Sequence, residues 1–449
     1  MLASAFPIVP IVFAASVVAA QVPSVTSLDP AHEAVDVDAT SIEELVVRFD
    51  RPMQTVGFSF CGGGPGFPEI PDGRRPFWRD ARTCVLPVSL QADHTYTLAL
   101  NCSGADRFRG VEGVPLDPTP WRFVTRPAEP RPATEQRARN AAALAALRTA
   151  LLEHYSYVDR RGVAWPGRFD AGRDAILAAP SDRGFALLAA ALLRPSQDLH
   201  AWVDHDGDRY PVGERTVDTL FRPGSAARHV GELRQAGREV LAARTDDGIG
   251  YLAIGTFTAR LDIEAVEREL AGLADAKGLV VDVRMNAGGD EERARRIAAW
   301  FVTGERVYAK HRTRVGPGDE RADADGFLPV AVRRIRGNAE PARRFDGPVV
   351  LLQSRHVMSS AEAFVLMMRQ AERCTTVGQA TYGSSGNPRP HELPNGVTVM
   401  LPSWRALRPD GSCFEGEGIA PDVVVAASVA DLATDDPMLA AALRQLRRD

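Results

Sequence analysis

The sequence predicts a multidomain protein with an N-terminal all-β sandwich, a small helical bundle and a C-terminal α/β core. Its 449 residues exceed the roughly 100–200 residues of one typical domain. Hydrophobic residues alternate with polar ones in short runs before residue 127, which indicates strands, and recur at helical spacing over residues 134–195. From residue 248 onward, short apolar runs alternate with helical segments, as in α/β layers.

Composition narrows the functional classes. Hydrophobic residues make up 45% of the chain and charged residues 25%, which excludes a disordered protein. The net charge of −5 lacks the basic excess of a nucleic-acid binder, so no nucleic-acid partner is expected. Only two of the 53 Lys+Arg residues are lysines, Lys277 and Lys310, so a mechanism with a catalytic lysine has two candidates.

Residues 1–20 are expected to be a cleaved signal peptide. The stretch LASAFPIVPIVFAASVVAA is apolar and uncharged and ends in small residues, which is typical of a secretory signal. A membrane anchor is the alternative, but Pro7, Pro10 and the short length disfavour a membrane-spanning helix. No later stretch approaches the roughly 20 apolar residues of a span, so we expect a secreted or periplasmic protein without further membrane contact.

Five cysteines are present: Cys61, Cys84, Cys102, Cys374 and Cys413. In an oxidising compartment the options are one disulfide within roughly the first hundred residues and a Cys374–Cys413 pair. The odd count leaves at least one free thiol. No CxxC or Cys/His cluster indicates zinc, and neither a metal nor an organic cofactor is expected.

Residues 21–127 make up the predicted sandwich. Strands are expected at 44–50, 83–90, 94–100 and 121–126, with glycine and proline crowding the connections. The segment SLDPAHEAVDVDATSIEELVVRFDRPM, followed by LPVSLQADHTYTLAL, resembles the bacterial immunoglobulin-like modules of secreted and surface proteins. That resemblance implies binding, spacing or display rather than chemistry.

The predicted helical bundle, residues 128–204, follows a proline-rich linker at 126–134. Alanine, leucine and arginine, all strong helix formers, dominate it, and a loop is expected around 162–169. The α/β core is expected over 205–449. Its predicted strands are 250–257, 278–284 and 348–354, and its predicted helices are 263–274, 291–302 and 359–372.

Two turns in the core are candidates for chemistry. In DVRMNAGGD, residues 282–290, a strand runs through two glycines into a helix whose first amides can bind an oxyanion, although an ordinary tight turn has the same pattern. In SRHVMSSAEAF, residues 354–364, Ser359 stands at the start of a helix. It is either a nucleophile or an N-cap that Glu362 completes as a capping box.

Two further segments carry titratable side chains. His200, in RPSQDLHAWVD, leaves the helical bundle and is either a base or a structural histidine. Glu415 and Glu417 lie in a glycine-bounded turn in CFEGEGIAPDVVV, where a solvated turn is the default. Taken singly, each of these segments has a structural explanation.

Together and in this order, the motifs resemble the tail-specific (carboxyl-terminal-processing) and tricorn-core family of serine peptidases. The matching segments within residues 134–449 are DLH, VVDVRMNAGG, SSAE, GQATYGSSGNP and EGEGIAPD. The resemblance implies a ClpP/crotonase-like core and hydrolysis of peptide or polypeptide substrates through an acyl-enzyme. It assigns the nucleophile to Ser359 and the oxyanion hole to Gly289, with Gly288 beside it, and to the amide of Ser360.

The general base departs from the pattern of many family members. Those members have a lysine directly after T-[FWY]-G, whereas Ser384 follows here, so the dyad lysine is absent. In the histidine-base branch, His200 matches the base and Glu415 matches its acidic partner. Glu417, in the same turn, is the alternative partner.

The residue that supports the histidine also differs. Leu199 stands where tricorn has a serine, and Asp198, Ser196 or Ser384 could replace that serine. His356 is closer in sequence to Ser359, but it shares the same short loop and is ranked below His200.

The substrate class follows from what lies between the bundle and the core. The interval 205–248 is short and lacks the glycine loop of a PDZ module, so general peptide hydrolysis fits better than recognition of C-terminal tails. The alternative is a catalytically silent ligand- or protein-binding module, as in retinoid-binding proteins with the same core. The presence of Ser359, His200 and Glu415 together favours the enzyme over the binding module. No G-x-S-x-G elbow supports a lipase, and the oligomeric state stays open.

Overall fold

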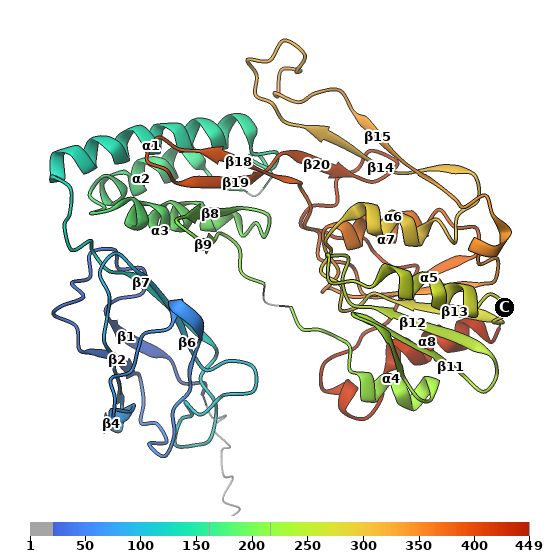
Figure 1. Ribbon diagram of the computed structural model, residues 1–449, viewed down its shortest axis with the longest axis horizontal. Coiled ribbons are helices and arrows are strands. Elements are labelled where there is room, and N and C mark those ends of the chain that lie inside the picture. Colours follow the sequence, from blue (N-terminus) through green and yellow to red (C-terminus); the bar gives the residue numbers. More distant parts are fainter. Residues whose placement is uncertain (1–20, 161, 216, 449) are drawn as a thin grey trace, which may run out of the picture. The chain divides into compact units, whose positions relative to one another are not determined.

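The computed structural model describes residues 21–160, 162–215 and 217–448. The expected signal peptide, residues 1–20, lies outside the described residues. The described chain divides into two compact units. The first comprises the chain up to Gln136 together with Ala179–Leu187, and the second comprises Arg137–Ala178 and the chain from Leu188 onward. Figure 1 shows the elements of both units in the order of the sequence.

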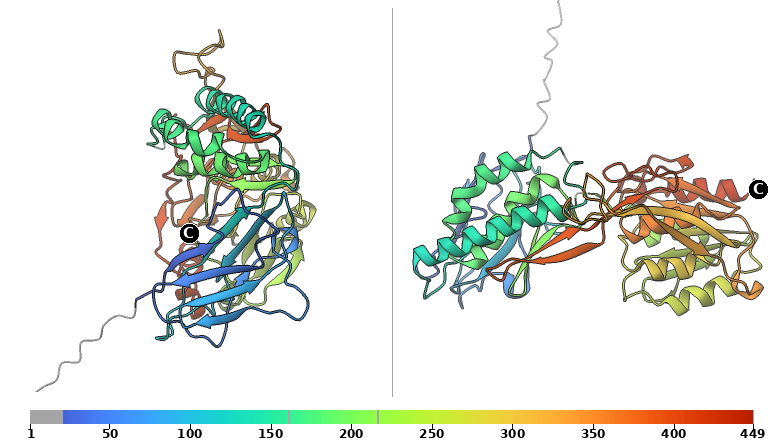
Figure 2. Two further views of the ribbon diagram at one scale, coloured as in Figure 1. Left: turned by 90° about the vertical axis from the view of Figure 1, so that its left-hand side faces the viewer. Right: turned by 90° about the horizontal axis from the view of Figure 1, so that it is seen from above.

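The first unit contains two antiparallel sheets, seen in the left panel of Figure 2. One has the order β1-β2-β5-β4 and the other β3-β6-β7. Both contribute to one hydrophobic core, in which Leu45, Leu98 and Trp121 are buried. The bounds are β1 (Val25–Asp29), β2 (Glu44–Phe49), β3 (Phe60–Cys61), η1 (Gly64–Gly66), β4 (Phe77–Asp80), β5 (Thr83–Pro87), β6 (Thr95–Leu100) and β7 (Thr119–Val124). The four strands predicted for this region are present as β2, β5, β6 and β7.

One disulfide joins Cys61 in β3 to Cys102 after β6. Cys84, Cys374 and Cys413 are free. The expected N-terminal pair therefore forms, whereas the alternative Cys374–Cys413 pair is wrong. Burial raises the pKa of the Cys84 and Cys374 thiols to about 12, so neither is a reactive thiolate near neutral pH.

Three helices correspond to the predicted bundle: α1 (Ala133–His154), α2 (Trp165–Leu177) and α3 (Asp182–Leu193), followed by η2 (Arg194–Ser196). The loop predicted at 162–169 is wrong in its second half, because α2 already begins at Trp165. Pro166 fits this first turn, where no amide partner is required. Trp165 and Phe169 are buried, so the segment also contributes to packing.

A seven-stranded sheet with the order β10-β11-β12-β13-β16-β17-β21 lies at the centre of the second unit. Its strands are β10 (Arg234–Gly237), β11 (Val240–Arg244), β12 (Ile249–Ile254), β13 (Gly278–Asp282), β16 (Val349–Gln353), β17 (Cys374–Gly378) and β21 (Val423–Val424). From β12 to β21 neighbouring strands are parallel, and β10 and β11 are antiparallel. Every residue of β12, β13 and β16 is buried, as expected for a sheet covered on both faces.

Helices cover both faces of this sheet (Figure 1). They are α4 (Pro223–Val230), α5 (Ile263–Gly272), α6 (Glu291–Ala298), α7 (Ser360–Met368), η3 (Pro341–Arg343), η4 (Asp431–Ala433) and α8 (Pro437–Leu446). One hydrophobic cluster packs α5, α6 and α7 on the sheet, and a second packs α4 and α8. The predicted strands and helices of the core match β12, β13, β16, α5, α6 and α7 to within a few residues.

Two smaller antiparallel sheets complete the second unit. The first has the order β18-β19-β8-β9 and the second β15-β14-β20. The bounds are β8 (Trp202–His205), β9 (Asp208–Pro211), β14 (Glu305–Thr313), β15 (Ala331–Arg336), β18 (Pro388–Glu392), β19 (Thr398–Pro402) and β20 (Trp404–Leu407). Through β8 the first sheet brings the segment just after the helices next to the C-terminal third of the chain.

Candidate active site

The candidate site lies where neighbouring parallel strands of the central sheet end. Phe257 follows β12, Gly288 follows β13, Ser359 follows β16 and Ser384 follows β17. Because these four strands are adjacent and parallel, their carboxyl ends meet at one edge of the sheet. Backbone hydrogen bonds join the turns: the Phe257 amide donates to the Gly288 carbonyl and the Ser359 amide to the Ser384 carbonyl, each at 2.9 Å.

Ser359 occupies the N-cap of α7 in a strained backbone conformation. Its φ of 58° and ψ of −130° are uncommon for a residue with a Cβ. Such a conformation persists only where the surroundings impose it, and it occurs often at functional sites. The Ser359 amide is held by the Ser384 carbonyl and by Glu362 Oε2, at 3.3 Å. The residue is only partly buried.

The His200 ring lies between two serine hydroxyls. His200 Nε2 is 3.0 Å from Ser359 Oγ, and Nδ1 is 2.9 Å from Ser384 Oγ. The histidine is 9% exposed. When the Ser359 hydroxyl donates to Nε2, Nδ1 must carry the ring proton and donate it to Ser384 Oγ. This is the tautomer in which Nε2 can accept a proton from Ser359.

The main chain at His200 is fixed by Asp198. The Asp198 carboxylate accepts a hydrogen bond from the His200 amide at 2.9 Å and from the Tyr155 hydroxyl at 2.8 Å. The Ser196 hydroxyl donates to a main-chain carbonyl. Of the three side chains considered as the ring's support, Ser384 is therefore the one whose hydroxyl is recorded at the imidazole, and Asp198 orients the backbone instead.

Glu362 is fully buried and connects the helix of Ser359 to the turn of Ser384. Its Oε1 accepts hydrogen bonds from Thr381 Oγ1 at 2.5 Å and the Gly383 amide at 2.7 Å, and its Oε2 accepts one from the Ser384 amide at 3.0 Å. Burial raises the pKa of Glu362 from 4.5 to about 7, while these donors oppose the shift. The sequence predicted Glu362 as a capping residue and as part of the SSAE motif, without a role toward Ser384. The neighbouring T-Y-G motif was visible, but nothing local indicated that the two would meet.

The two carboxylates of the CFEGEG turn have different surroundings. Glu415 is 7% exposed, and its Oε2 accepts a hydrogen bond from the Ser385 amide at 2.9 Å. Glu417 is exposed and lies 3.7 Å from the Arg408 guanidinium. Glu415 is therefore the inward carboxylate, beside the residue that follows Ser384.

Gly288 and Gly289 form the turn between β13 and α6. A Cβ on Gly288 would lie 2.8 Å from the Ser359 Cβ, so the turn packs directly against Ser359. The Asn286 side chain holds the turn by accepting a hydrogen bond from the Gly288 amide at 2.8 Å. No acceptor among the described residues is hydrogen-bonded to the amides of Gly289 or Ser360. Two such amides beside a hydroxyl can bind an oxyanion.

The other titratable candidates have different neighbours. His356 Nδ1 is 3.2 Å from Thr219 Oγ1, and burial, together with Arg215, lowers the pKa of His356 to about 4. Lys277 directly precedes β13, at the end of the sheet opposite the site, and Lys310 lies within β14.

In the part of the chain that the structure describes, no group of three His, Cys, Asp or Glu side chains is arranged to hold a metal ion. Nor does any helix among those residues combine the length and hydrophobicity that a membrane crossing needs.

A family profile matches the part of the sequence that contains most of the residues of this site. Residues 248–425 match the sequence profile of peptidase family S41. That range includes the Gly288–Gly289 turn, Ser359, Ser384 and Glu415. His200 lies outside it, on the segment between the helices and β8.

Individual relatives match the same region. The chain is 25% identical over 179 residues to the carboxy-terminal processing protease CtpB of Bacillus subtilis, which covers 39% of this chain and 34% of CtpB. It is 25% identical over 186 residues to the tricorn protease of Thermoplasma volcanium, covering 40% and 16% respectively. The chain thus spans about a third of the length of the first relative and less of the second. Among solved structures, a candidate peptidase from Parabacteroides merdae has a TM-score of 0.60 and 25% identity, over 69% of this chain and 96% of that one.

Proposed function

We propose that this chain, whose residues 248–425 are a domain of peptidase family S41, is a serine peptidase that hydrolyses peptide bonds through an acyl-enzyme on Ser359. The observation that carries the proposal is the 3.0 Å distance between Ser359 Oγ and His200 Nε2, which is within reach for proton transfer from nucleophile to base. A peptide or polypeptide substrate is supported by the similarity to proteases.

Acylation begins with the Ser359 proton. His200 Nε2 takes it while Ser359 Oγ attacks the scissile carbonyl carbon, and the carbonyl electron pair moves onto oxygen. The amides of Gly289 and Ser360 stabilise that oxyanion, a contribution of roughly 10²–10³ in rate for each such donor. When the intermediate collapses, the imidazolium gives its proton to the departing amine and the acyl group stays on Ser359.

Water then releases the product. His200 takes a proton from the water as it adds to the acyl carbon, and collapse breaks the bond to Ser359 Oγ and returns the proton to the serine. Ser384 accepts the hydrogen bond from His200 Nδ1 throughout, which holds the tautomer and stabilises the imidazolium. Glu415 supports this arrangement through the Ser385 amide, which fixes the segment that carries Ser384.

We further propose that the chain belongs to a histidine-base branch of the family without a PDZ module. The imidazole that faces Ser359 supports the histidine base. The arrangement that we propose has an immunoglobulin-like sandwich over 21–127, a helical bundle over 128–204 and a ClpP/crotonase-like core over 205–449. The four- and three-stranded antiparallel sheets support the sandwich. The Cys61–Cys102 disulfide supports an oxidising, secreted or periplasmic location.

Labelling with a fluorophosphonate probe tests the nucleophile. The wild-type protein should be labelled, and Ser359→Ala should abolish labelling. Ser360→Ala is the matched control, because its buried hydroxyl has no partner among the described residues and its amide remains after the substitution. Labelling of the Ser359→Ala variant would show that another residue is the nucleophile, and an unlabelled wild-type protein would favour a silent binding module.

A second test concerns the base. His200→Ala should lower the acylation rate by roughly 10²–10⁴ while the unfolding transition stays in place, since a positioned base contributes that much. His356→Ala is the matched control and should leave the rate unchanged. An unaltered acylation rate in His200→Ala would remove His200 as the base.

A further inference from the structure

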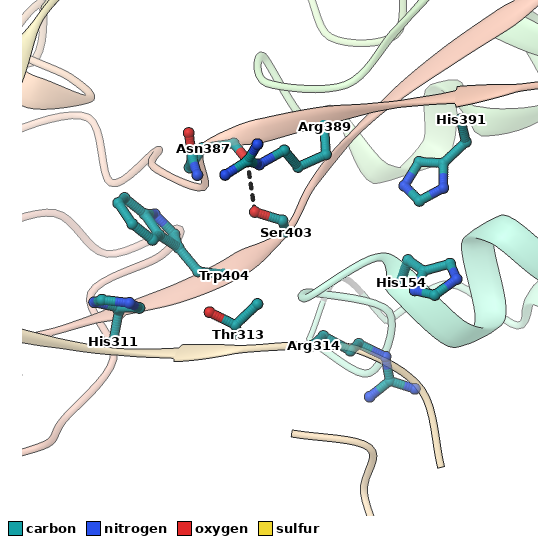
Figure 3. Close-up of a pocket in the computed structure, with 9 residues that line it drawn as sticks. All are labelled: His154, His311, Thr313, Arg314, Asn387, Arg389, His391, Ser403 and Trp404. Atoms are coloured by element: carbon teal, nitrogen blue, oxygen red, sulfur yellow. Dashed lines mark hydrogen bonds between the residues drawn. The ribbon is translucent and has the colours of Figure 1, made fainter. Parts of the chain in front are cut away.

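A cavity of about 360 Å³ lies in the second unit beside the segment that follows Ser384. The end of α1, the end of β14, strand β18 and the start of β20 all contribute side chains to it (Figure 3). The side chains that matter here are His154, His311, Arg314, Arg389, His391 and Trp404. The function proposed above makes no use of any of them.

The polar groups of this cavity are mostly hydrogen-bond donors, and no Asp or Glu is among the described residues that line it. Three buried nitrogens have no partner among the described residues: His311 Nδ1, Arg314 Nε and Trp404 Nε1. An unpaired buried nitrogen is costly, so the N–H groups of Arg314 and Trp404, and that of His311 in its Nδ1-protonated tautomer, favour a ligand that can accept a hydrogen bond. Arg389, in contrast, is exposed, and no hydrogen bond or ion pair to the described residues is recorded for its guanidinium, which lies beside Asn387 and Ser403 in Figure 3.

The fixed charge of the cavity comes from its arginines. His391 stacks on His154 with ring centroids 4.9 Å apart, and burial and this neighbour lower the pKa of His391 to about 4. Burial also lowers the pKa of His311. Near neutral pH these two rings are therefore uncharged. Arg314 donates to the Asp325 and Leu152 carbonyls at 2.6 and 2.8 Å, so Arg389 is the cation that can pair with a ligand. A carboxylate matches such a set, because a planar guanidinium binds it through paired hydrogen bonds.

The cavity is close to the candidate active site along the chain. Its wall is held to Gly386, whose carbonyl accepts hydrogen bonds from the Ser403 amide at 2.9 Å and the Trp404 amide at 3.1 Å. Asn387, which also lines the cavity, is three residues after Ser384, so their Cα atoms are at most about 11 Å apart. An extended peptide covers the same distance in about three residues.

From these observations we propose that the cavity binds a carboxylate of the peptide substrate, either an acidic side chain or the C-terminal carboxylate, about three to five residues from the scissile bond. This inference rests on the proposed function. Arg389 provides the charge, and the unpartnered nitrogens of His311 and Trp404 provide further donors. The site therefore selects substrates by charge at a position remote from the bond that is cleaved.

Binding without turnover tests the inference. The full chain with Ser359→Ala is titrated against fluorescein-labelled decapeptides of alanine and serine that carry one Glu at each position in turn. Matched peptides carry Gln in place of Glu, and each peptide is made with a free or an amidated C-terminus. Fluorescence anisotropy should give about tenfold weaker binding when the recognised carboxylate is neutralised, by Gln or by amidation, and this identifies its source.

Two arginine substitutions in the same background locate the site. Arg389→Gln should remove the preference for the carboxylate, whereas Arg336→Gln, at an exposed position in β15, should keep it. Equal binding of charged and neutral peptides would overturn the inference, as would an equal loss for all peptides in Arg389→Gln. If wild-type protein is labelled by the fluorophosphonate while no charge preference exists, only the carboxylate site fails. A charge preference without labelling would instead remove the peptidase function and leave the site.

Discussion

Ser384 lies beside His200, at the position where the sequence resemblance places a lysine. Where a lysine would follow T-[FWY]-G, this chain has a serine whose hydroxyl is 2.9 Å from His200 Nδ1. A single residue thus accounts for two departures, the missing lysine and the missing serine at Leu199. In the proposed mechanism an imidazole is the base, so this position needs only a hydrogen-bond acceptor for His200 Nδ1.

Replacing Ser384 measures how much its hydrogen bond with His200 contributes to catalysis. A hydrogen bond to a charged group contributes about 1.5–3 kcal/mol, so Ser384→Ala should lower kcat by roughly 10–100-fold, with little change in KM. Ser385→Ala, one position away, is the matched control, since its recorded contact to Glu415 uses the amide. Steady-state hydrolysis of a fluorogenic peptide gives both constants. Wild-type kcat in Ser384→Ala would mean that another group orients the ring.

Glu362 should make the stability of the protein depend on pH. Its pKa is raised from 4.5 to about 7 by burial, so between these values the folded state holds a proton that the unfolded state has lost. The stability from this group is therefore complete below pH 4.5 and is lost as pH rises through about 7. Over the whole window the free energy of unfolding should change by on the order of 3 kcal/mol.

The comparison of Glu362→Gln with wild type isolates this effect. Urea unfolding at pH 5 and pH 8 should show a smaller difference in the variant, because glutamine does not titrate. Glu417→Gln, at an exposed position of the same site region, should keep the wild-type difference. An identical pH dependence in Glu362→Gln and wild type would mean that Glu362 does not titrate in this range.

At the scale of elements, the turn between β13 and α6 is a tightly constrained connection of the site. Gly288 has a φ of 100°, and a Cβ there would lie 2.8 Å from both the Met358 carbonyl oxygen and the Ser359 Cβ. Neither contact is tolerable without movement of the backbone that carries Ser359. Only glycine therefore lets β13 and β16 deliver their turns to the same point.

Gly288→Ala should consequently impair both folding and acylation. Displacing the oxyanion amides should lower the acylation rate by at least about 10²-fold, since one donor is worth that much. Gly272→Ala is the matched control: Gly272 ends α5, has open space around it and should be neutral or slightly stabilising as alanine. Fluorophosphonate labelling and thermal unfolding report the two effects, and wild-type labelling in Gly288→Ala would exclude the tight packing at Ser359.

Sequence patterns located the longer elements well and the short ones poorly. The helix at 263–274 and the strand at 278–284 correspond to α5 and β13, because their hydrophobic periodicity extends over whole elements. The start of α2 was missed, since glycine and proline in GVAWPGRF indicate a loop, although proline is also favoured in a first helical turn. Strands of two residues, such as β3, carry no periodic pattern at all.

The contacts that assemble the site join residues far apart in the sequence, so local sequence patterns do not predict them. His200 lies 159 residues from Ser359 and 184 residues from Ser384 in the sequence. The order of the motifs and their residue types indicated Ser359 and His200 as candidates. The pairing of strand β8 with strand β19 is what brings the segment of His200 to the C-terminal part of the chain. The choice among Asp198, Ser196 and Ser384 depended on side-chain direction, which a sequence does not specify.

At the scale of the whole molecule, the disulfide and the candidate site belong to different units. Cys61 and Cys102 lie in the first unit, whereas His200, Ser359 and Ser384 all lie in the second. A cross-link that closes a sequence separation of 41 residues stabilises a fold by about 4 kcal/mol in the chain-entropy account. That stabilisation should act on the first unit alone.

The double variant Cys61→Ala/Cys102→Ala should therefore lower the unfolding temperature of one calorimetric transition and leave the rate of fluorophosphonate labelling unchanged. Reductant should shift the same transition in the wild-type protein and have no further effect on the double variant, which controls for the three free thiols. If the labelling rate fell together with the transition temperature, the sandwich would be required to form the active site. An unchanged rate instead means that the second unit holds its serine and histidine in place through its own contacts, among them the β8–β19 pairing and the Glu362 hydrogen bonds.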